Sequence, residues 1–184
     1  IFIGGEEIKK FENNISSLCK TKFCVGTNSG TDALTLGMYL MGIKRGDEVI
    51  TPPNSFVAST AAIVHLGARP VFVDVQEDQN INPTLIEAAI SSKTKVIMPV
   101  HLSGKMAEMK KIMEIANRYG LEIVEDAAQA AGSKLGEKFA GSWGSVGCFS
   151  AHPLKNLNAC GDAGFITTNE AGIARKIRSM RNHG

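Results

Sequence analysis

The stretch that decides the fold is residues 95–126, which read KVIMPVHLSGKMAEMKKIMEIANRYGLEIVED. Its two ends, Lys95–Val100 and Leu121–Asp126, are short apolar runs rich in β-branched residues, which is typical of buried strands. Between them, Ala107–Tyr119 has apolar residues at helical spacing, and Gly120 follows where a helix end favours a left-handed residue. A strand, a helix and a second strand in this order predict two parallel strands joined by a crossover helix.

The same alternation continues on both sides of this unit. Further strands are predicted at Lys22–Val25, Glu48–Thr51, Pro70–Asp74, Val146–Ser150 and Gly164–Thr168, and further helices at Glu6–Leu18, Thr31–Ile43, Ser55–Leu66, Pro83–Ile90 and from Glu170 onward. Strands that are apolar nearly throughout need cover on both faces, and the intervening helices supply it. The sequence therefore predicts an α/β fold, with a mostly parallel sheet between two layers of helices, in a single domain.

Composition and charge exclude several classes of protein. The chain has 184 residues, of which 43% are hydrophobic and 21% charged, with a net charge of +2, so it is neither disordered nor collagen-like. Basic residues are scattered apart from a modest cluster at Arg175–Arg181, so we expect no nucleic-acid partner. No apolar run approaches the ~20 residues that cross a bilayer, and Ile1–Glu7 lacks the features of a signal peptide. We therefore expect no membrane contact and a cytoplasmic protein.

Neither the cysteines nor the histidines have the spacing of a metal site. The four cysteines, none in a CxxC pair and all in apolar or Gly-rich segments, are Cys19, Cys24, Cys148 and Cys160. We expect them to be reduced and buried, as small hydrophobic residues. The histidines without a ligand partner at a useful interval are His65, His101 and His183, so no zinc site is predicted.

The segment Gly26–Asp32, GTNSGTD, lies directly after a predicted strand and before a predicted helix. Free amides at a helix N-terminus, the positive end of its dipole and the hydroxyl of Thr31 together favour a phosphate. The segment is neither GxGxxG nor a P-loop, because it lacks the required glycines and lysine. The alternative is a Ser or Thr cap at an ordinary joint between a strand and a helix.

Two further segments carry candidate functional residues. Asp126 ends a strand, where ligands of open α/β sheets bind, and its carboxylate could keep a heterocyclic nitrogen protonated; the alternative is a helix cap. Lys155 lies in a polar turn, SAHPLKN, after the strand that ends at Ser150. A partly desolvated lysine can lose its proton and form a Schiff base with a carbonyl, although most loop lysines are simply solvated.

A phosphate cradle, an acid at a strand end and a lysine in an enclosed turn are together what pyridoxal 5'-phosphate requires. With this ordered set, the sequence resembles the DegT/StrS family of nucleotide-sugar aminotransferases, which have the aspartate-aminotransferase fold (fold type I). The resemblance covers essentially the whole chain. It rests on Asn28–Leu34, Gly46–Ile50, Gly67–Val75, Pro99–Gly104, Glu125–Ala130, Phe149–Leu157 and Arg181–Gly184.

The resemblance implies roles for individual residues. Lys155 would be the Schiff-base lysine, Asp126 the partner of the pyridine nitrogen and Gln129 a hydrogen-bond partner of the ring hydroxyl. The phosphate would be held by Gly30, Thr31 and Ser150. Phe56 falls where the family places an aromatic ring on the pyridine face; the alternative for this residue is core packing at the start of a helix.

The resemblance also has consequences for the protein as a whole. Family members are about twice as long and build each site between two subunits. We therefore expect residues 1–184 to be the cofactor-binding large domain of a homodimer, as a fragment without the extreme N-terminus and the C-terminal small domain.

Some residues depart from the family pattern or leave their role open. Family members commonly read Gly-Asp-Gly-Gly or Gly-Glu-Gly-Gly after the lysine loop, whereas this chain reads Gly161-Asp162-Ala163-Gly164, directly after Cys160. The methyl group of Ala163 stands where the family has none, which puts a close approach of the backbone there in question. His152, three residues before Lys155, could orient the phosphate or the lysine loop, or make a structural hydrogen bond.

The implied function is transamination of a nucleotide-linked keto sugar, with an amino acid, glutamate in the family, as the nitrogen donor. Three alternatives remain. A dehydratase of the same family would carry His in place of Lys155. A non-catalytic member would bind the cofactor or a sugar nucleotide only to sense it. A nucleotide-binding domain without pyridoxal phosphate would share the fold alone.

Overall fold

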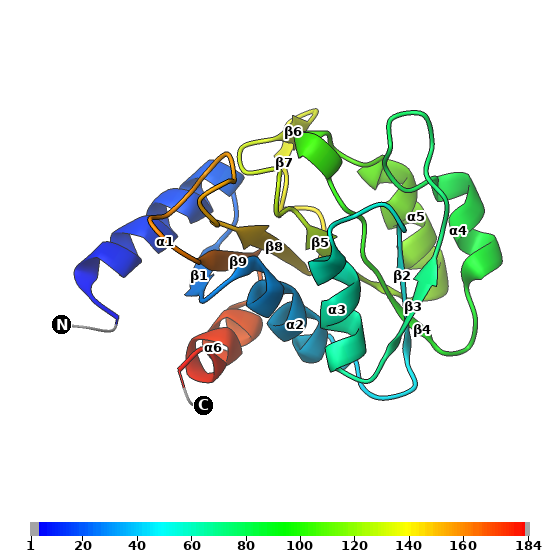
Figure 1. Cartoon of the computed structure of the whole chain (residues 1–184), viewed down its shortest axis with the longest axis horizontal. Coiled ribbons are helices and arrows are strands. Elements are labelled where there is room, and N and C mark those ends of the chain that lie inside the picture. The colour runs from blue at the N-terminus through cyan, green and yellow to red at the C-terminus, as the bar shows by residue number, and fades with distance from the viewer. Residues whose placement is uncertain (1–3, 183–184) are drawn as a thin grey trace.

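A seven-stranded sheet between two layers of helices forms the body of the structure, a computed structural model that describes residues 4–182 (Figure 1). In spatial order the strands are β1 (Phe23–Thr27), β9 (Gly164–Thr168), β8 (Val146–Ser150), β5 (Glu122–Asp126), β4 (Thr94–Ile97), β2 (Glu48–Thr51) and β3 (Arg69–Phe72). The helices are α1 (Glu6–Cys19), α2 (Gly30–Leu40), α3 (Val57–His65), α4 (Pro83–Ala89), α5 (Met109–Tyr119) and α6 (Ala171–Met180), with a 3-10 turn, η1 (Leu102–Gly104).

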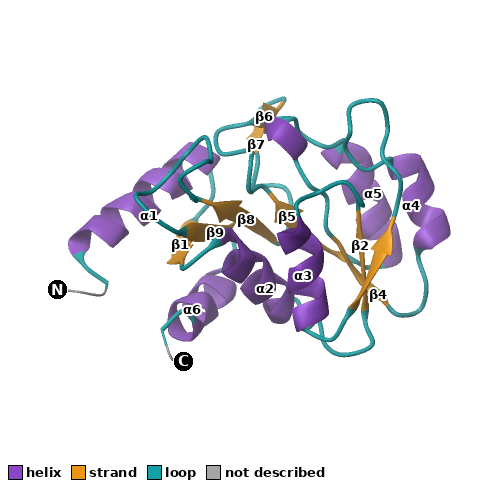
Figure 2. Cartoon of the chain, viewed as in Figure 1, coloured by secondary structure: helices purple, strands orange, loops and turns teal. Residues whose placement is uncertain are grey.

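Alternate residues of each strand pack on opposite helical layers. In β5, Ile123 joins the buried cluster that includes residues of α1 and α5, whereas Val124 joins the cluster that includes residues of α2, α3 and α6. Figure 2 shows helices on both sides of the sheet. The predicted three-layer α/β architecture is therefore confirmed, and the sheet buries both of its faces because its strands are apolar on both.

Left-handed glycines lie between helices and the strands that follow them, and the predicted Gly120 is the C-cap of α5. Gly46, Gly67 and Gly120 have φ angles of +91°, +74° and +64°, in the left-handed region that a side chain disfavours. The helix boundaries differ from the predicted ones by a few residues; for example, α3 begins at Val57 rather than at Ser55. Each of these glycines thus lies where the chain must turn back to begin the next strand.

Three features of the sheet differ from the prediction. β9 runs antiparallel to both of its neighbours, while the pairs among β8, β5, β4, β2 and β3 are parallel. β3 is an edge strand rather than a fully covered one, and its Phe72 is half exposed. A small hairpin of β6 (Lys134–Leu135) and β7 (Lys138–Phe139), which was not predicted, lies outside the main sheet.

The cysteines are unpaired, as predicted, but one prediction about them is wrong. Cys19, Cys24 and Cys148 are buried, and burial raises the pKa of the Cys19 thiol to about 12. Cys160, in contrast, is exposed, because the loop after β8 runs over the surface. Within residues 4–182, no cluster of three or more His, Cys, Asp or Glu side chains could hold a metal ion. Among the helices described, none has the length and apolar character needed to cross a membrane.

The arginines of the C-terminal cluster are partly used for structure. Arg181 Nη1 lies 2.5 Å from Glu12 Oε1, and Arg178 Nη2 lies 3.5 Å from Glu12 Oε2. Glu12 also accepts a hydrogen bond from the amide of Gly26, at 3.0 Å. These contacts join the first and last helices to the end of β1, immediately before the loop that enters α2.

Candidate active site

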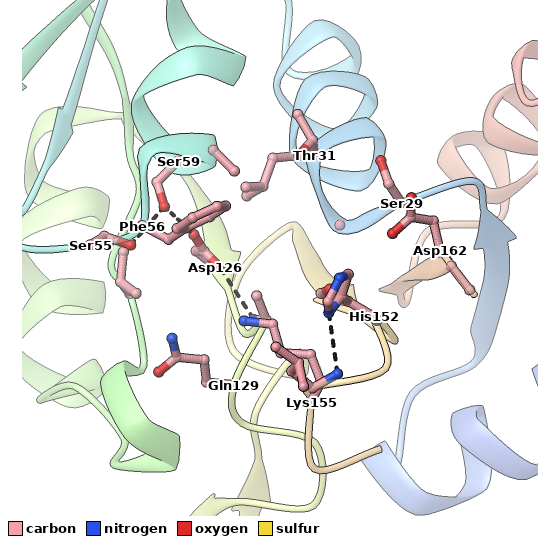
Figure 3. A pocket seen from close by; sticks show the side chains of 18 residues that line it. Ser29, Thr31, Ser55, Phe56, Ser59, Asp126, Gln129, His152, Lys155 and Asp162 are labelled. Atoms are coloured by element: carbon pink, nitrogen blue, oxygen red, sulfur yellow. Dashed lines mark hydrogen bonds between the residues drawn. The ribbon is translucent and has the colours of Figure 1, made fainter. Parts of the chain in front are cut away.

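A cavity of about 530 Å³ lies at the edge where the parallel strands end. The loops that follow β1, β2, β5 and β8 contribute to its lining (Figure 3). All the residues predicted for the site line it together: Gly30, Thr31, Phe56, Asp126, Gln129, Ser150 and Lys155. Residues as far apart in sequence as Gly30 and Lys155 therefore meet, since parallel strands place their carboxyl ends on one edge.

The start of α2 and the end of β8 form a cradle of backbone and hydroxyl groups. Ser29 caps the helix, because its Oγ accepts from the amide of Asp32 at 3.0 Å. The cap predicted as an alternative thus exists, and it leaves the first two helical amides, of Gly30 and Thr31, without an acceptor within residues 4–182. Capping and anion binding are therefore compatible here, and Ser150 lies beside these amides.

The cradle requires glycine at two positions. A Cβ on Gly30 would lie 2.7 Å from the Cβ of Ser150, and one on Gly164 would lie 2.3 Å from the carbonyl oxygen of Ser29. The close backbone approach expected near Ala163 is therefore made by Gly164, which this chain retains. Ala163 itself accepts a hydrogen bond from the amide of Ala151 and is only partly buried, so its methyl group does not obstruct the approach.

We predict that Gly30→Ala destabilises the fold by about 1–3 kcal/mol and weakens cofactor binding, because the added methyl group forces α2 away from Ser150. Urea unfolding and a cofactor titration measure the two effects. Gly172→Ala is the matched control, since an added Cβ there meets nothing within 4 Å. Equal stability of the Gly30 variant and the control would show that the cradle is looser than described.

Asp126 is a buried carboxyl group with a donor on each oxygen. It is 3% exposed; Ser59 Oγ donates to its Oδ2 at 2.6 Å, and the amide of Ala128 donates to its Oδ1 at 3.2 Å. Burial raises the pKa of Asp126 above its ordinary value, and the hydrogen bonds from Ser59 and Ala128 oppose that shift. A cation beside Asp126 would lower this pKa, so the site favours a positively charged partner.

Lys155 lies in a loop held by hydrogen bonds within the backbone and to its neighbours. Its amide donates to the carbonyl of His152 at 2.8 Å, and the Asn156 side chain donates to the carbonyl of Ala131 at 2.8 Å. The side chain of Lys155 is partly buried and lines the cavity. His152 Nδ1 accepts from the amide of Leu154 at 3.2 Å, within the lysine loop, and its ring also lines the cavity, so the contact is compatible with both of its predicted roles.

Phe56 and Gln129 present defined groups to the cavity. Phe56 is 69% exposed, which rules out the alternative of core packing and leaves its ring face accessible. The amide of Ser103 donates to Gln129 Oε1 at 2.6 Å, from a residue in the left-handed region (φ 53°). Because its oxygen is occupied, the side-chain amino group of Gln129 is the end that remains to donate to a ligand.

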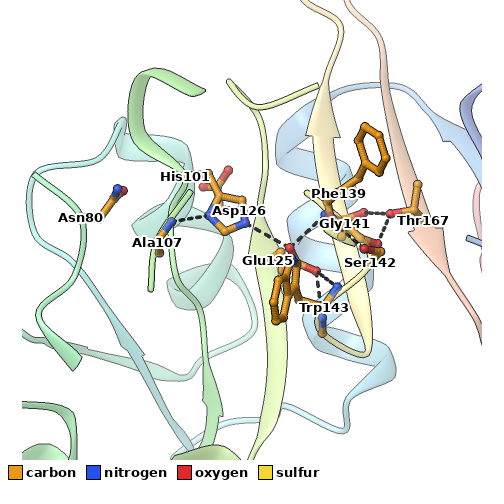
Figure 4. A network of polar contacts seen from close by, with 12 residues as sticks. Asn80, His101, Ala107, Glu125, Asp126, Phe139, Gly141, Ser142, Trp143 and Thr167 are labelled. Atoms are coloured by element: carbon orange, nitrogen blue, oxygen red, sulfur yellow. Dashed lines mark hydrogen bonds and ion pairs between the residues drawn. The ribbon is translucent and has the colours of Figure 1, made fainter. Parts of the chain in front are cut away.

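A second polar network, which sequence reasoning missed, surrounds Glu125, the residue before Asp126 in β5 (Figure 4). His101 is fully buried; its Nδ1 accepts from the amide of Ala107 at 3.2 Å, and its Nε2 lies 3.0 Å from Glu125 Oε2. Since Nδ1 is an acceptor, the proton of the neutral ring is on Nε2, which donates to Glu125. The backbone amide of His101 donates to the carbonyl of Asp126, so this network supports the strand end that carries the acid.

The Glu125 side chain is fully buried, and each of its carboxylate oxygens accepts two hydrogen bonds. Its Oε1 accepts from the amides of Trp143 and Gly144, both at 2.8 Å, and its Oε2 accepts from the amide of Gly141 at 2.9 Å as well as from His101. Four donors compensate the loss of water around the carboxylate. The network therefore fixes the loop before β8 against β5.

We predict that Glu125→Gln lowers the free energy of unfolding by at least about 2 kcal/mol. The amino group of the glutamine would face N–H groups that now donate to the carboxylate, so those donors would lose their acceptor. Urea unfolding measures this loss. Glu122→Gln is the control: it changes an exposed glutamate at the start of the same strand and is expected to stay within about 0.5 kcal/mol of the parent. A Glu125 variant as stable as this control would contradict the network.

The groups that line the cavity fit pyridoxal 5'-phosphate. Free helix amides and Ser150 suit the phosphate, the buried carboxylate suits a protonated pyridine nitrogen, and the Gln129 amino group suits the ring oxygen. An exposed aromatic ring suits the pyridine face, and Lys155 provides an amine for the aldehyde. The donor set therefore has a use for each functional group of this cofactor.

Comparison with known proteins gives a consistent result. Residues 1–184 match the family described as DegT/DnrJ/EryC1/StrS aminotransferases. A pleiotropic regulatory protein of Geobacillus stearothermophilus and a UDP-N-acetyl-3-dehydro-alpha-D-glucosamine 3-aminotransferase of Acidithiobacillus ferrooxidans are each 45% identical over 100% of this chain and 50% of their own length. The chain thus spans about half the length of these relatives.

The solved structures agree with the fold. The crystal structure of NtdA from Bacillus subtilis with bound cofactor PMP superposes with a TM-score of 0.92 and 39% identity, over 98% of this chain and 41% of that one. The fold is accordingly that of the fold type I aminotransferases, as the sequence predicted. By sequence and by structure, the chain belongs to the DegT/DnrJ/EryC1/StrS aminotransferase family.

Proposed function

We propose that the full-length protein catalyses pyridoxal-phosphate-dependent transamination of a nucleotide-linked keto sugar, with an amino acid, glutamate in the first instance, as the nitrogen donor. The observation that carries the proposal is the meeting of Lys155, Asp126 and the Gly30–Thr31 amides in one cavity. The Acidithiobacillus relative, whose name is that of a sugar-nucleotide aminotransferase, supports the substrate class. The same sugar-nucleotide chemistry would place the protein in amino-sugar biosynthesis.

Each residue has a role in this proposal. Pyridoxal phosphate supplies an aldehyde that bonds to amines and a protonated ring that withdraws electrons from the substrate carbon. Lys155 Nζ would be the amine that holds the aldehyde, and as a general base it would move a proton at the substrate carbon. Asp126 holds the proton on the ring nitrogen, and the Gly30, Thr31 and Ser150 groups orient the phosphate. Phe56 would cover one face of the ring and exclude water from it.

The test is a reaction panel with the full-length protein. Incubated with pyridoxal phosphate, glutamate and a set of keto-sugar nucleotides, it should convert at least one sugar to its amino form and release 2-oxoglutarate. Cofactor that binds without turnover of any donor would instead favour the sensing alternative. Loss of water from the sugar without amination would favour a dehydratase, against which Lys155 already argues.

We further propose that residues 1–184 are the large domain of a homodimer in the cytoplasm and that a smaller C-terminal domain completes each subunit. The length of the relatives supports the missing domain. Two exposed apolar side chains at the cavity, Phe56 and Leu154, support cover by another part of the assembly, and two-fold pairs are the commonest such assembly. Unpaired buried thiols support a reducing compartment.

The oligomeric state is a separate prediction. Full-length protein should sediment as a dimer at concentrations at which it is active. A monomer with full activity would contradict the proposal that each site is completed by a partner.

A further inference from the structure

Two serines, Ser55 just before α3 and Ser59 in its first turn, connect the cavity to Asp126 (Figure 3). Ser59 is 2% exposed, and its Oγ lies 2.6 Å from Asp126 Oδ2. Ser55 is half-buried, and its Oγ lies 2.7 Å from the Oγ of Ser59. Both serines also line the cavity, so a continuous row of hydroxyl groups leads from the cavity wall to the buried carboxyl group.

The direction of this row follows from the number of protons. Ser59 has a single hydroxyl proton and donates it to Asp126, so it can only accept in its contact with Ser55. Ser55 must then be the donor in that contact. Both hydroxyl protons therefore point toward Asp126, which is the arrangement that stabilises a negative charge on the carboxyl group.

The contact of Ser59 is not the usual one for a serine in a helix. Such hydroxyls commonly bond to the carbonyl four residues back, as Thr35 Oγ1 does to the carbonyl of Thr31 at 2.9 Å. Ser59 instead crosses to β5, 67 residues away in sequence. Its hydroxyl is therefore directed at the acid and not at a backbone carbonyl of α3.

We propose that Ser59 is a positioning residue that keeps the Asp126 carboxylate ionised and fixed in orientation toward a protonated ring nitrogen, and that Ser55 orients the hydroxyl of Ser59. This inference rests on the proposed function, because it assumes that the cavity binds pyridoxal phosphate. Burial favours the protonated form of Asp126, and the hydrogen bond from Ser59 is the first of the contacts that oppose it. Without that contact, a buried carboxyl group would hold a ring cation less well.

The test compares two ligands that differ only at the ring nitrogen: pyridoxal 5'-phosphate and its 1-deaza analogue, in which C–H replaces the nitrogen. Both have the same aldehyde and phosphate, so Lys155 and the cradle treat them alike. In the full-length protein, Ser59→Ala should weaken binding of pyridoxal phosphate by about tenfold, the scale of a hydrogen bond to a charged group, and leave binding of the analogue unchanged. Equilibrium dialysis of the cofactor-free protein measures both.

Three further variants complete the design. Ser59→Thr retains the hydroxyl and should restore the difference between the ligands, whereas Ser55→Ala should weaken pyridoxal phosphate by a smaller factor than Ser59→Ala. Thr60→Ala removes the hydroxyl of the neighbouring helical residue, which does not line the cavity, and should change neither affinity.

The outcomes separate the two proposals. Equal losses for both ligands in Ser59→Ala, or no loss for either, would overturn the role of Ser59 and leave the proposed function standing. A parent protein that binds neither ligand would overturn the proposed function and this inference with it. A loss confined to pyridoxal phosphate and restored by Ser59→Thr would support both.

Discussion

Lys155→Ala in the full-length protein should lower the rate of transamination by several orders of magnitude. One amine is proposed both to bind the aldehyde and to move the proton at the substrate carbon, so its removal eliminates two functions at once. The cradle at Gly30 and the carboxyl group of Asp126 lie on other elements, so the variant should still bind the cofactor. Steady-state rates, together with the visible absorbance of the bound cofactor, measure the two effects.

The control for this prediction is Lys138→Ala. Lys138 and Lys134 lie on the β6–β7 hairpin, are exposed and do not line the cavity. Borohydride reduction of the parent protein, followed by peptide mapping, should place the cofactor on Lys155. Cofactor found on either hairpin lysine, or full activity of Lys155→Ala, would remove the central assignment.

The parts of the site that follow strand ends were predictable from sequence. Asp126 and the turn with Lys155 both come directly after apolar runs, and the carboxyl ends of parallel strands lie on one edge, so their meeting follows from the fold class. The contact between Ser59 and Asp126 was not predictable in this way. It depends on the rotation of α3 against β5, which a one-dimensional pattern does not specify.

The burial of Glu125 had a signal that periodicity could have supplied. In a strand, alternate residues share a face, so Glu125 lies on the same side as Ile123, which is buried. Residue type argued the other way, because glutamate is seldom buried unless it is paired. Its partner, His101, lies 24 residues away on a different segment, and no local pattern joins the two.

The antiparallel direction of β9 also has a physical reason that the sequence contains. The connection from Ser150 to Gly164 has no helical pattern. Neighbouring parallel strands are usually joined by a crossover helix, whereas antiparallel neighbours need none, so the missing helix favours an antiparallel pair. Periodicity places a strand and gives its buried face but not its direction. The β6–β7 hairpin was missed for a different reason, since strands of two residues are too short for alternation to be detected.

Asp126→Asn should retain the cofactor on Lys155 but lower the rate of transamination by about 10²–10³-fold, the scale of losing one preorganised electrostatic group. A neutral side chain cannot keep the ring nitrogen protonated, and the electron withdrawal that assists proton transfer is lost with that charge. Cofactor stoichiometry and the steady-state rate measure the two effects. A variant that turns over at the parent rate would show that Asp126 does not have this role.

In the cofactor-free protein, the same substitution should change how stability depends on pH. The folded-state pKa of Asp126 lies above its unfolded value, because burial disfavours the charged form. Its contribution to stability is therefore fully present below the unfolded pKa, near pH 4, and is lost as the pH rises through the folded value. The amide side chain of the variant does not titrate, so the stability of Asp126→Asn relative to the parent should increase from about pH 4 toward neutral pH.

Urea unfolding across this range, with the exposed Asp74→Asn as control, measures the difference. Parallel profiles for the parent and Asp126→Asn would mean that the Asp126 carboxyl group is not held at a raised pKa, and the requirement for a stabilising cation beside it would fall.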